Sequence, residues 1–200
     1  MVSKLDHLLH EVKNGRTQLS RAFQDSLEVE KIPYTCLKGC HHCCYHPFAI
    51  SVFEGALIYN ALVTKGLWSQ LRPKFVETAR ETDGLKPEIW LLAKIPCPLL
   101  DKGLCQVFPS CPLICRTTYS TSVPDYCEAH KFGYVNAMVE RGAVLTDFIE
   151  LEMKVHRKVR APYRRYPLAW ATLLGEKVVQ TDDIEGVDSF MPALYSEVSK

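Results

Sequence analysis

The chain has no long hydrophobic run. No stretch is apolar over the roughly 18 residues that a membrane-spanning helix requires, so we expect no membrane insertion. Charged residues such as Lys4, Glu11 and Arg16 interrupt the apolar residues of segment 1–23, which therefore lacks the apolar core of a secretory signal. We expect a soluble, cytoplasmic protein.

Charge of one sign and the common catalytic motifs are also missing. The formal net charge is only +1, so no general attraction to nucleic acid or to an anionic membrane follows from composition. We find no GxSxG nucleophile elbow, HExxH pair, phosphate-binding loop or GxGxxG motif. Hydrolytic or nucleotide-dependent catalysis therefore has no residues in its favour, and any enzymatic role would be redox chemistry at a metal centre.

What the chain has in excess is cysteine, nine residues in all. A reducing cytoplasm keeps thiols free, so clustered cysteines indicate metal binding more than disulfides. Cys36, Cys40, Cys43 and Cys44 fall within nine residues, close enough for one loop to wrap around a metal. Thiolates are soft ligands that select zinc or iron–sulfur clusters.

A second group of cysteines follows about fifty residues later: Cys97, Cys105, Cys111 and Cys115, with Cys127 further on. One zinc ion or one cubane cluster takes four ligands. The chain has more cysteines than one such site needs. The additional thiols imply two metal sites, one polynuclear site, or redox and structural roles for some of them. The adjacent pair Cys43-Cys44 points two ways from one backbone, which suits two metals or one ligand beside a packed neighbour.

The order of these motifs resembles a known family. The resemblance lies in Cys36-x-x-x-Cys40-x-x-Cys43-Cys44, then in the segments CPLLD from residue 97, CQVF from residue 105 and PLICR from residue 112, and finally in Cys127. In these motifs the chain resembles the YkgJ-like proteins, a family named for its CxxCxxCC motif and associated with zinc or iron chelation. Two features depart from the family pattern. The first spacing is three residues, and Cys111 stands where the family usually has an arginine.

The resemblance implies a metal centre and assigns no reaction. Its metal ligands would be the eight matching cysteines, residues Cys36, Cys40, Cys43, Cys44, Cys97, Cys105, Cys115 and Cys127. Arg116 could stabilise the negative charge of a bound cofactor, or it could be a surface arginine. Cys111 is a ninth ligand or a free thiol beside the site. We expect His41, His42 and His46 to hydrogen-bond around the ligands more than to bind metal.

Three functions stay open at this point. The four-cysteine front loop favours a 4Fe-4S cluster over zinc, with a structural or electron-transfer role alone or within a larger complex. Alternatively, zinc could staple a module that binds protein or nucleic acid through Lys154, Arg157, Lys158, Arg160, Arg164 and Arg165. The solvated end of a basic helix explains these six residues equally well. The spacing CxxxCxxC also occurs in radical S-adenosylmethionine enzymes, although we see no strand–helix alternation to accompany it.

We expect one mainly α-helical domain over residues 1–200, with helices around a cysteine-rich, loop-built metal-binding core at about 36–127. Helical spacing of apolar residues predicts helices over 5–23 and over 129–159, the second with a junction at Gly142. A third begins at Val52, after a capping box formed by Ser51 and Glu54.

Local signals predict the rest of the fold. Gly66 and Pro73 should kink or break the helix that begins at Val52. One or two helical turns should lie within the loop 83–98, and the sequence Asp101-Lys102-Gly103 predicts a tight hairpin. Only a short helix is expected, over 169–174, between a basic helix end at 154–165 and an acidic surface tail at about 180–200.

Overall fold

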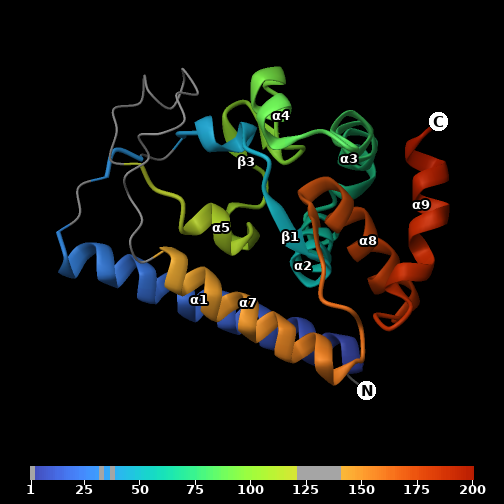
Figure 1. Ribbon diagram of the computed structural model, residues 1–200, viewed down its shortest axis with the longest axis horizontal. Coiled ribbons are helices and arrows are strands. Elements are labelled where there is room, and N and C mark those ends of the chain that lie inside the picture. Colours follow the sequence, from blue (N-terminus) through green and yellow to red (C-terminus); the bar gives the residue numbers. More distant parts are fainter. Residues whose placement is uncertain (1–2, 32–33, 37–38, 121–140) are drawn as a thin grey trace.

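The protein is described by a computed structural model that covers residues 3–31, 34–36, 39–120 and 141–200. It is a single, mainly α-helical domain with two small sheets, as expected (Figure 1). Its long elements are the helices α1 (Lys4–Val29), α2 (Val52–Thr64), α3 (Trp68–Thr82), α7 (Arg141–Lys158) and α8 (Leu168–Thr181). None of the helices in these ranges is both long and apolar enough to cross a bilayer.

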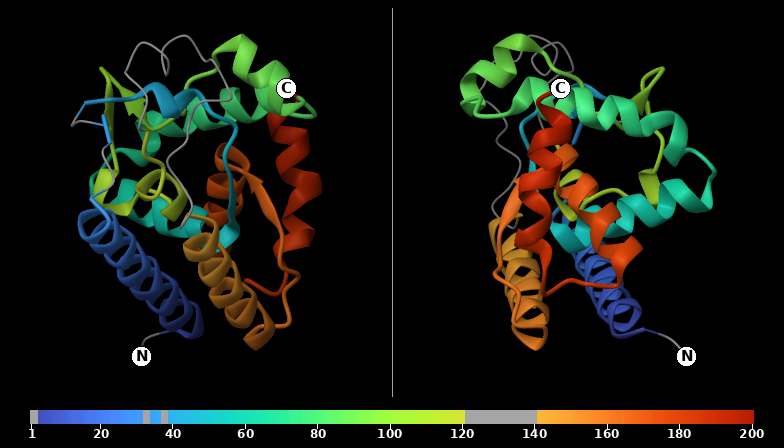
Figure 2. Two further views of the ribbon diagram at one scale, coloured as in Figure 1. Left: turned by 60° about the vertical axis from the view of Figure 1, so that its left-hand side comes forward. Right: turned by 90° about the vertical axis from the view of Figure 1, so that its right-hand side faces the viewer.

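Helices α1 and α7 lie side by side and run in opposite directions (Figures 1 and 2). A capping box between Ser3 and Asp6 begins α1, and a stripe of buried residues follows along its length. Gly15, a weak helix former, lies where α7 crosses: a Cβ at this position would meet the Leu151 side chain at 2.1 Å. The glycine therefore makes room for the partner helix. Helix α1 ends at Val29, six residues beyond the predicted end at residue 23.

Helices α2 and α8 form the buried centre. A Cβ on Gly55 would come within 2.0 Å of the Ala171 carbonyl oxygen, and one on Gly175 within 2.3 Å of the Ala56 amide nitrogen. The two backbones thus touch where they cross, and both helices are buried along most of their length. Strand β1 (Ala49–Ser51) leads into α2 and pairs antiparallel with β4 (Arg165–Pro167), which leads into α8.

The break predicted near Gly66 is confirmed, because α2 ends at Thr64 and α3 begins at Trp68. Pro73, by contrast, lies inside α3 and does not end it. Its ring is exposed, so water can reach the carbonyl group that the missing N–H leaves without a helical donor. The predicted helical turns in 83–98 form α4 (Pro87–Ala93).

The cysteine-bearing segments consist of short elements beside these helices. They are the 3-10 turn η1 (His42–Tyr45), strands β2 (Leu100–Asp101) and β3 (Leu104–Cys105), the turn η2 (Phe108–Ser110) and the one-turn helix α5 (Leu113–Arg116). Strands β2 and β3 pair as the predicted tight hairpin, in which Lys102 and Gly103 both take positive φ angles of 47° and 78°.

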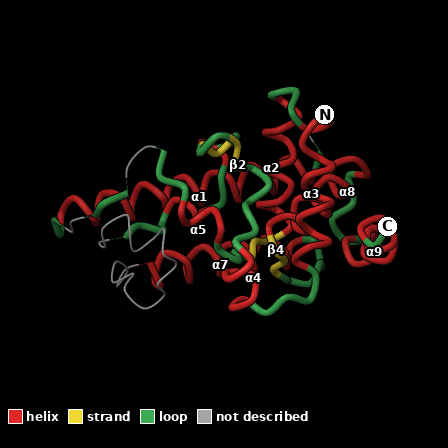
Figure 3. The backbone as a smooth tube through the Cα atoms, turned by 90° about the horizontal axis from the view of Figure 1, so that it is seen from above, coloured by secondary structure: helices red, strands yellow, loops and turns green. Residues whose placement is uncertain are grey.

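The end of the chain corrects the sequence prediction. Helix α8 reaches Thr181, far beyond the predicted end, and the turn η3 (Val187–Phe190) and helix α9 (Met191–Val198) follow in place of a surface tail. The charged residues between 182 and 188 do face solvent, but the apolar residues among and after them are buried: Ile184, Val187, Leu194 and Val198. Seen from above, α9 lies at the opposite end of the molecule from the end of α1 at residue 29 (Figure 3).

Ion pairs and hydrogen bonds attach α9 to the helices before it. The guanidinium of Arg72 donates to both Glu176 on α8 and Glu197 on α9. The indole N–H of Trp68 also donates to Glu176, at 2.7 Å. Arg80 Nε donates to the Val198 carbonyl oxygen at 2.6 Å. These contacts and the buried apolar residues make α9 part of the folded core.

A network of buried charged groups lies between α1, α2 and α7. Glu54 and Glu152 are both almost fully buried and close enough for their charges to interact. Ser51 Oγ and the Tyr163 hydroxyl donate to the two carboxylate oxygens of Glu152. Burial, followed by the charge of Glu54, raises the pKa of Glu152 to about 8, so this carboxyl group keeps its proton at neutral pH.

Replacing Leu194 by Ala tests the packing of α9. We expect the free energy of unfolding to fall by about 2–4 kcal/mol, because the change empties a buried position. Ser196→Ala, on the exposed face of the same helix, should change it by less than about 0.5 kcal/mol. Urea denaturation followed by circular dichroism measures both, and equal, small effects of the two changes would mean that α9 is a surface tail after all.

The pH dependence of stability tests the buried carboxyl group. Above the ordinary carboxyl pKa and up to about pH 8, the folded chain holds a proton on Glu152 that the unfolded chain has released. Stability should therefore fall as pH rises through this window, by at most about 1.4 kcal/mol per pH unit. Burial lowers the pKa of His156 to about 4. His156 therefore changes the pH dependence of stability only below about pH 6.5, where the imidazole of the unfolded chain is protonated.

Glu152→Gln should flatten the fall in stability between pH 6.5 and 8, since an amide cannot ionise. Glu150→Gln, an exposed position on the same helix, is the matched control and should leave the slope as in the unaltered chain. Urea midpoints at several pH values measure the effect. The same slope in both variants would show that Glu152 is ionised in the folded protein.

Candidate metal centre

Five cysteines from three separate segments lie close together. Cys43 comes from η1, Cys97 precedes the hairpin, Cys105 ends it, and Cys111 and Cys115 flank the start of α5. The charge of Cys115 interacts with the charges of all four others, and Cys97 interacts with Cys105 and Cys43. We call these five residues the inner thiol cluster.

Backbone hydrogen bonds join the front loop to the hairpin segment and close the hairpin. The amide of Cys97 donates to the carbonyl oxygen of Cys44 at 2.7 Å, which joins the front loop to the second group. The amide of Leu100 donates to Cys97, and the amide of Gln106 to Leu99, both at 2.9 Å. Lysine ammonium groups add two further bonds, from Lys74 to the Leu100 carbonyl (2.8 Å) and from Lys65 to the Gln106 carbonyl (2.6 Å).

Apolar side chains anchor the same segments in the protein core. Leu99, Val107 and Leu113 alternate with the cysteines along the chain and are at most 1% exposed. Each of them belongs to the main hydrophobic cluster of the molecule. The cysteines between them are thereby held at the edge of that core, so the position of the thiols depends on the packing of the helices.

Burial sets the protonation of these thiols. It is the main cause that raises the pKa of Cys97 to about 12 and that of Cys105 to about 11. Burial likewise raises the pKa of Cys115 well above its ordinary value, and the charges of the neighbouring cysteines act in the same direction. Metal binding requires thiolates, so a metal cation entering here displaces protons and relieves the repulsion between sulfurs.

The inner thiol cluster contains four of the predicted ligands: Cys43, Cys97, Cys105 and Cys115. Three others belong to the front segment, residues 36–44. The sulfur of Cys36 accepts a hydrogen bond from the Ser120 amide at 3.2 Å, Cys40 is exposed, and Cys44 is half-buried next to Cys43. Cys127 falls outside the described residues. Six of the described cysteines are free thiols, namely Cys40, Cys44, Cys97, Cys105, Cys111 and Cys115.

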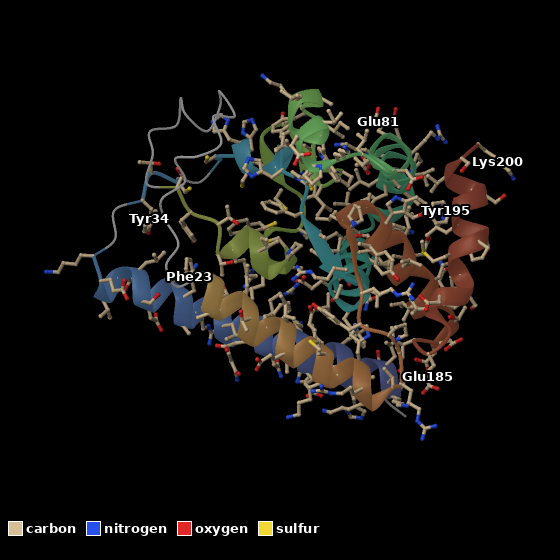
Figure 4. The ribbon with its side chains drawn as sticks, in the orientation of Figure 1. Phe23, Tyr34, Glu81, Glu185, Tyr195 and Lys200 are labelled. Carbon is tan, nitrogen blue, oxygen red and sulfur yellow. The ribbon has the colours of Figure 1, made fainter. Side chains whose placement is uncertain are left out.

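The segment around Cys36 is held by its own contacts. The amide of Thr35 donates to the Ser120 carbonyl oxygen at 2.8 Å. The ring of Tyr119 packs between Phe23 and Tyr34, with centroid distances of 5.8 and 4.9 Å. Figure 4 shows Phe23 near the end of α1 and Tyr34 above it. Aromatic packing on α1 therefore positions Cys36.

The thiols do not form a closed single-ion site. Over residues 3–31, 34–36, 39–120 and 141–200, no three histidine, cysteine, aspartate or glutamate side chains converge on one point as a mononuclear metal would require. The donor set is nonetheless appropriate for a soft metal, since it consists of several neighbouring thiols in a buried setting.

Two arginines adjoin the inner thiol cluster. Arg116, which the sequence indicated, forms a side-chain hydrogen bond with Cys111 and donates to the Pro109 carbonyl oxygen. Arg16, which the sequence analysis missed, is 2% exposed and donates from Nη1 to the Ser110 carbonyl oxygen at 3.0 Å. Its signal was present in the sequence, because Arg16 occupies a position in the otherwise apolar stripe of α1.

The three histidines of the front loop contact residues of that loop and of the hairpin turn. His41 Nδ1 is 3.1 Å from the Gly39 carbonyl oxygen, and its ring stacks on that of His42 with centroids 5.4 Å apart. His41 also lies beside Gly103 in the hairpin turn. The ring of His46 lies 5.7 Å from that of Phe48, centroid to centroid.

Three of the six basic residues considered for nucleic-acid binding have partners within the protein. Lys158 pairs with Glu11 at 2.7 Å, Arg164 lies 3.5 Å from Asp188, and Arg165 donates to the Ala49 carbonyl oxygen. The other three side chains are exposed, namely Lys154, Arg157 and Arg160. The Tyr163 hydroxyl points inward to Glu152. Lys158 and Arg164 also keep 45% and 59% of their side-chain surface exposed, and nucleic-acid binding by the six residues stays a prediction.

Comparison with known proteins gives one match. The CxxCxxCC family model, described as "Putative zinc- or iron-chelating domain", matches residues 35–138. Comparisons with curated proteins and with solved structures found no match. The matched range covers just over half of the 200 residues and contains every cysteine of the chain. This chain therefore belongs to the CxxCxxCC family of zinc- or iron-chelating domains.

Proposed function

We propose that this protein binds an iron–sulfur cluster, a 4Fe-4S cubane, through the inner thiol cluster, and that the cluster has a structural or electron-transfer role. Membership of the family supports metal binding in general. The observation that carries the proposal is the gathering of five thiols from three segments, in which Cys115 interacts with the other four and the residues are half-buried or buried. Cysteines used only as core residues have no reason to gather in this way.

The four cysteines within nine residues of the front loop favour a polynuclear cluster over a single zinc ion, because they resemble iron–sulfur ligation more than the two-plus-two spacing of a zinc finger. A tetrahedral zinc site with bonds of about 2.3 Å draws its four sulfurs close around one point. An iron–sulfur core contains several irons and bridging sulfides, so its thiolate ligands stand further apart around it.

The short elements around the thiols support a structural role. Strands β2 and β3 have two residues each, and α5 is a single turn. Elements of this length bury little surface of their own and are stabilised when a metal crosslinks them. When bound, the cluster would also supply a one-electron redox couple, whose potential the nearby arginines and the degree of burial would adjust.

Metal analysis of protein purified without oxygen tests the proposal. We expect iron and acid-labile sulfide in equal amounts, together with the broad visible absorption of an iron–sulfur cluster. A colourless protein with one or two zinc ions would contradict the cluster and favour a zinc-stapled module. A protein that carries no metal, and takes up neither zinc nor iron with sulfide, would contradict metal binding altogether.

Removing the metal tests the structural role. A metal present at about 1,000 times its dissociation constant stabilises the folded state by about 4 kcal/mol. For a chain of this size the melting temperature should then fall by roughly 8–16 °C when the metal is removed. Thermal melting followed by circular dichroism, with metal content verified at each step, measures the effect.

Cys115→Ser is the matched control for this experiment. Because it removes a sulfur that interacts with the four other inner thiols, it should melt at the same low temperature with and without chelator. Reloading the unaltered chain should restore its original melting temperature. A melting curve unchanged by verified metal removal would show that the metal does not stabilise the fold.

A further inference from the structure

Cys111 lies in the inner thiol cluster although it is not among the eight cysteines of the family pattern. It stands between η2 and α5 and is 2% exposed. Its amide donates to the Phe108 carbonyl oxygen at 3.3 Å. Its sulfur is near enough to Cys105 and Cys115 for their charges to interact. Its position is thus that of a member of the cluster.

Two positively charged side chains act on this sulfur. Arg116 forms a side-chain hydrogen bond with Cys111, and the charge of Arg16 also acts on it. Arg16 is held against the loop by its bond to Ser110, the residue before Cys111. Among the described residues its Nε atom has no hydrogen-bond partner, although the side chain is almost fully buried.

A neutral thiol does not account for two guanidinium groups at one place. Burying an arginine is costly unless an opposite charge or several acceptors compensate. Arg16 has the charge of Glu54 nearby, but Arg116 repels it. A thiolate at Cys111 within an anionic metal–thiolate centre would give the buried Arg16 a negative partner in addition to Glu54 and Glu152, and would also attract the half-buried Arg116.

We propose that Cys111 is a ligand of the metal centre and that Arg16 and Arg116 balance the negative charge on this side of it. The proposal rests on the proposed function, since it presupposes a metal in the inner thiol cluster. It adds to the ligand set a residue that the CxxCxxCC pattern omits. The two arginines reach the centre from different elements, α1 and α5, so that the centre joins them.

Loading the full-length chain with metal tests this assignment. Cys111→Ser, Cys111→Ala and the unaltered protein are each reconstituted with iron and sulfide, and separately with cobalt(II), whose thiolate charge-transfer absorption grows with the number of bound sulfurs. We expect both variants to bind at least twofold less metal per chain, or to show weaker sulfur-to-cobalt absorption. Circular dichroism verifies that they are folded.

Val107→Ala is the matched control. Val107 is fully buried in the same loop, so its truncation destabilises the loop without removing a sulfur. It should lose less bound metal than either Cys111 variant does. Full metal content and unchanged absorption in both Cys111 variants would overturn the assignment of Cys111 and leave the metal centre in place. Failure of the unaltered chain to bind any metal would overturn both proposals.

The loaded wild-type protein provides a test that does not depend on variant folding. An anomalous-scattering map of its crystals should place a metal within about 2.3 Å of the Cys111 sulfur, the usual bond length to a thiolate. A metal bound by other inner thiols and remote from Cys111 would overturn the assignment.

Discussion

The hydrogen bond from the Leu113 amide to the Glu54 carboxylate, 2.8 Å long, joins the helical core to the cysteine-bearing loop. Glu54 lies in the first turn of α2, and Leu113 begins α5, which carries Cys115. Arg16 fixes the same loop through the Ser110 carbonyl. The cost of burying two charged side chains is partly offset because each bonds to main-chain groups that would otherwise be unpaired in the interior. The loop therefore has a defined place against the helices even where its own elements are only one turn long.

This arrangement makes the candidate centre dependent on long-range packing. The carboxylate of Glu54 can reach Leu113 only because α2 is held in place by its close crossing with α8 at Gly55 and Gly175. The guanidinium of Arg16 reaches Ser110 only because α1 is aligned along α7. A change at either helix crossing would displace the loop and, with it, Cys111 and Cys115. The fold and the metal centre are thus parts of one cooperative unit, with the buried charges between them.

The sequence could predict what depends on local pattern. The apolar stripe of α1, the start of α2 after Ser51 and the hairpin after Asp101 follow from spacing and turn residues, and all three are confirmed. Partners distant in sequence could not be predicted. The Ser51 hydroxyl does accept from the Glu54 amide, but the Glu54 carboxylate, expected to reach back to the cap, bonds Leu113 instead. The acidic residues near the end suggested a surface tail. That prediction was wrong because the sequence pattern alone does not show that the apolar residues among and after them pack against α3 and α8.

The cysteines show the same limit within the candidate site. Spacing identified two groups but could not show that they meet, nor that the sulfur of Cys36 would accept a hydrogen bond from the Ser120 amide. The pair Cys43-Cys44 was expected to point two ways, and the two residues do have different roles. The sulfur of Cys43 interacts with the second group, whereas Cys44 accepts the Cys97 amide through its carbonyl oxygen. Adjacent cysteines on a 3-10 turn thereby supply a thiol and a backbone acceptor to the same neighbour. Cys44 brings the two groups together through its main-chain carbonyl, and this contact allows the Cys43 thiol to join the inner thiol cluster.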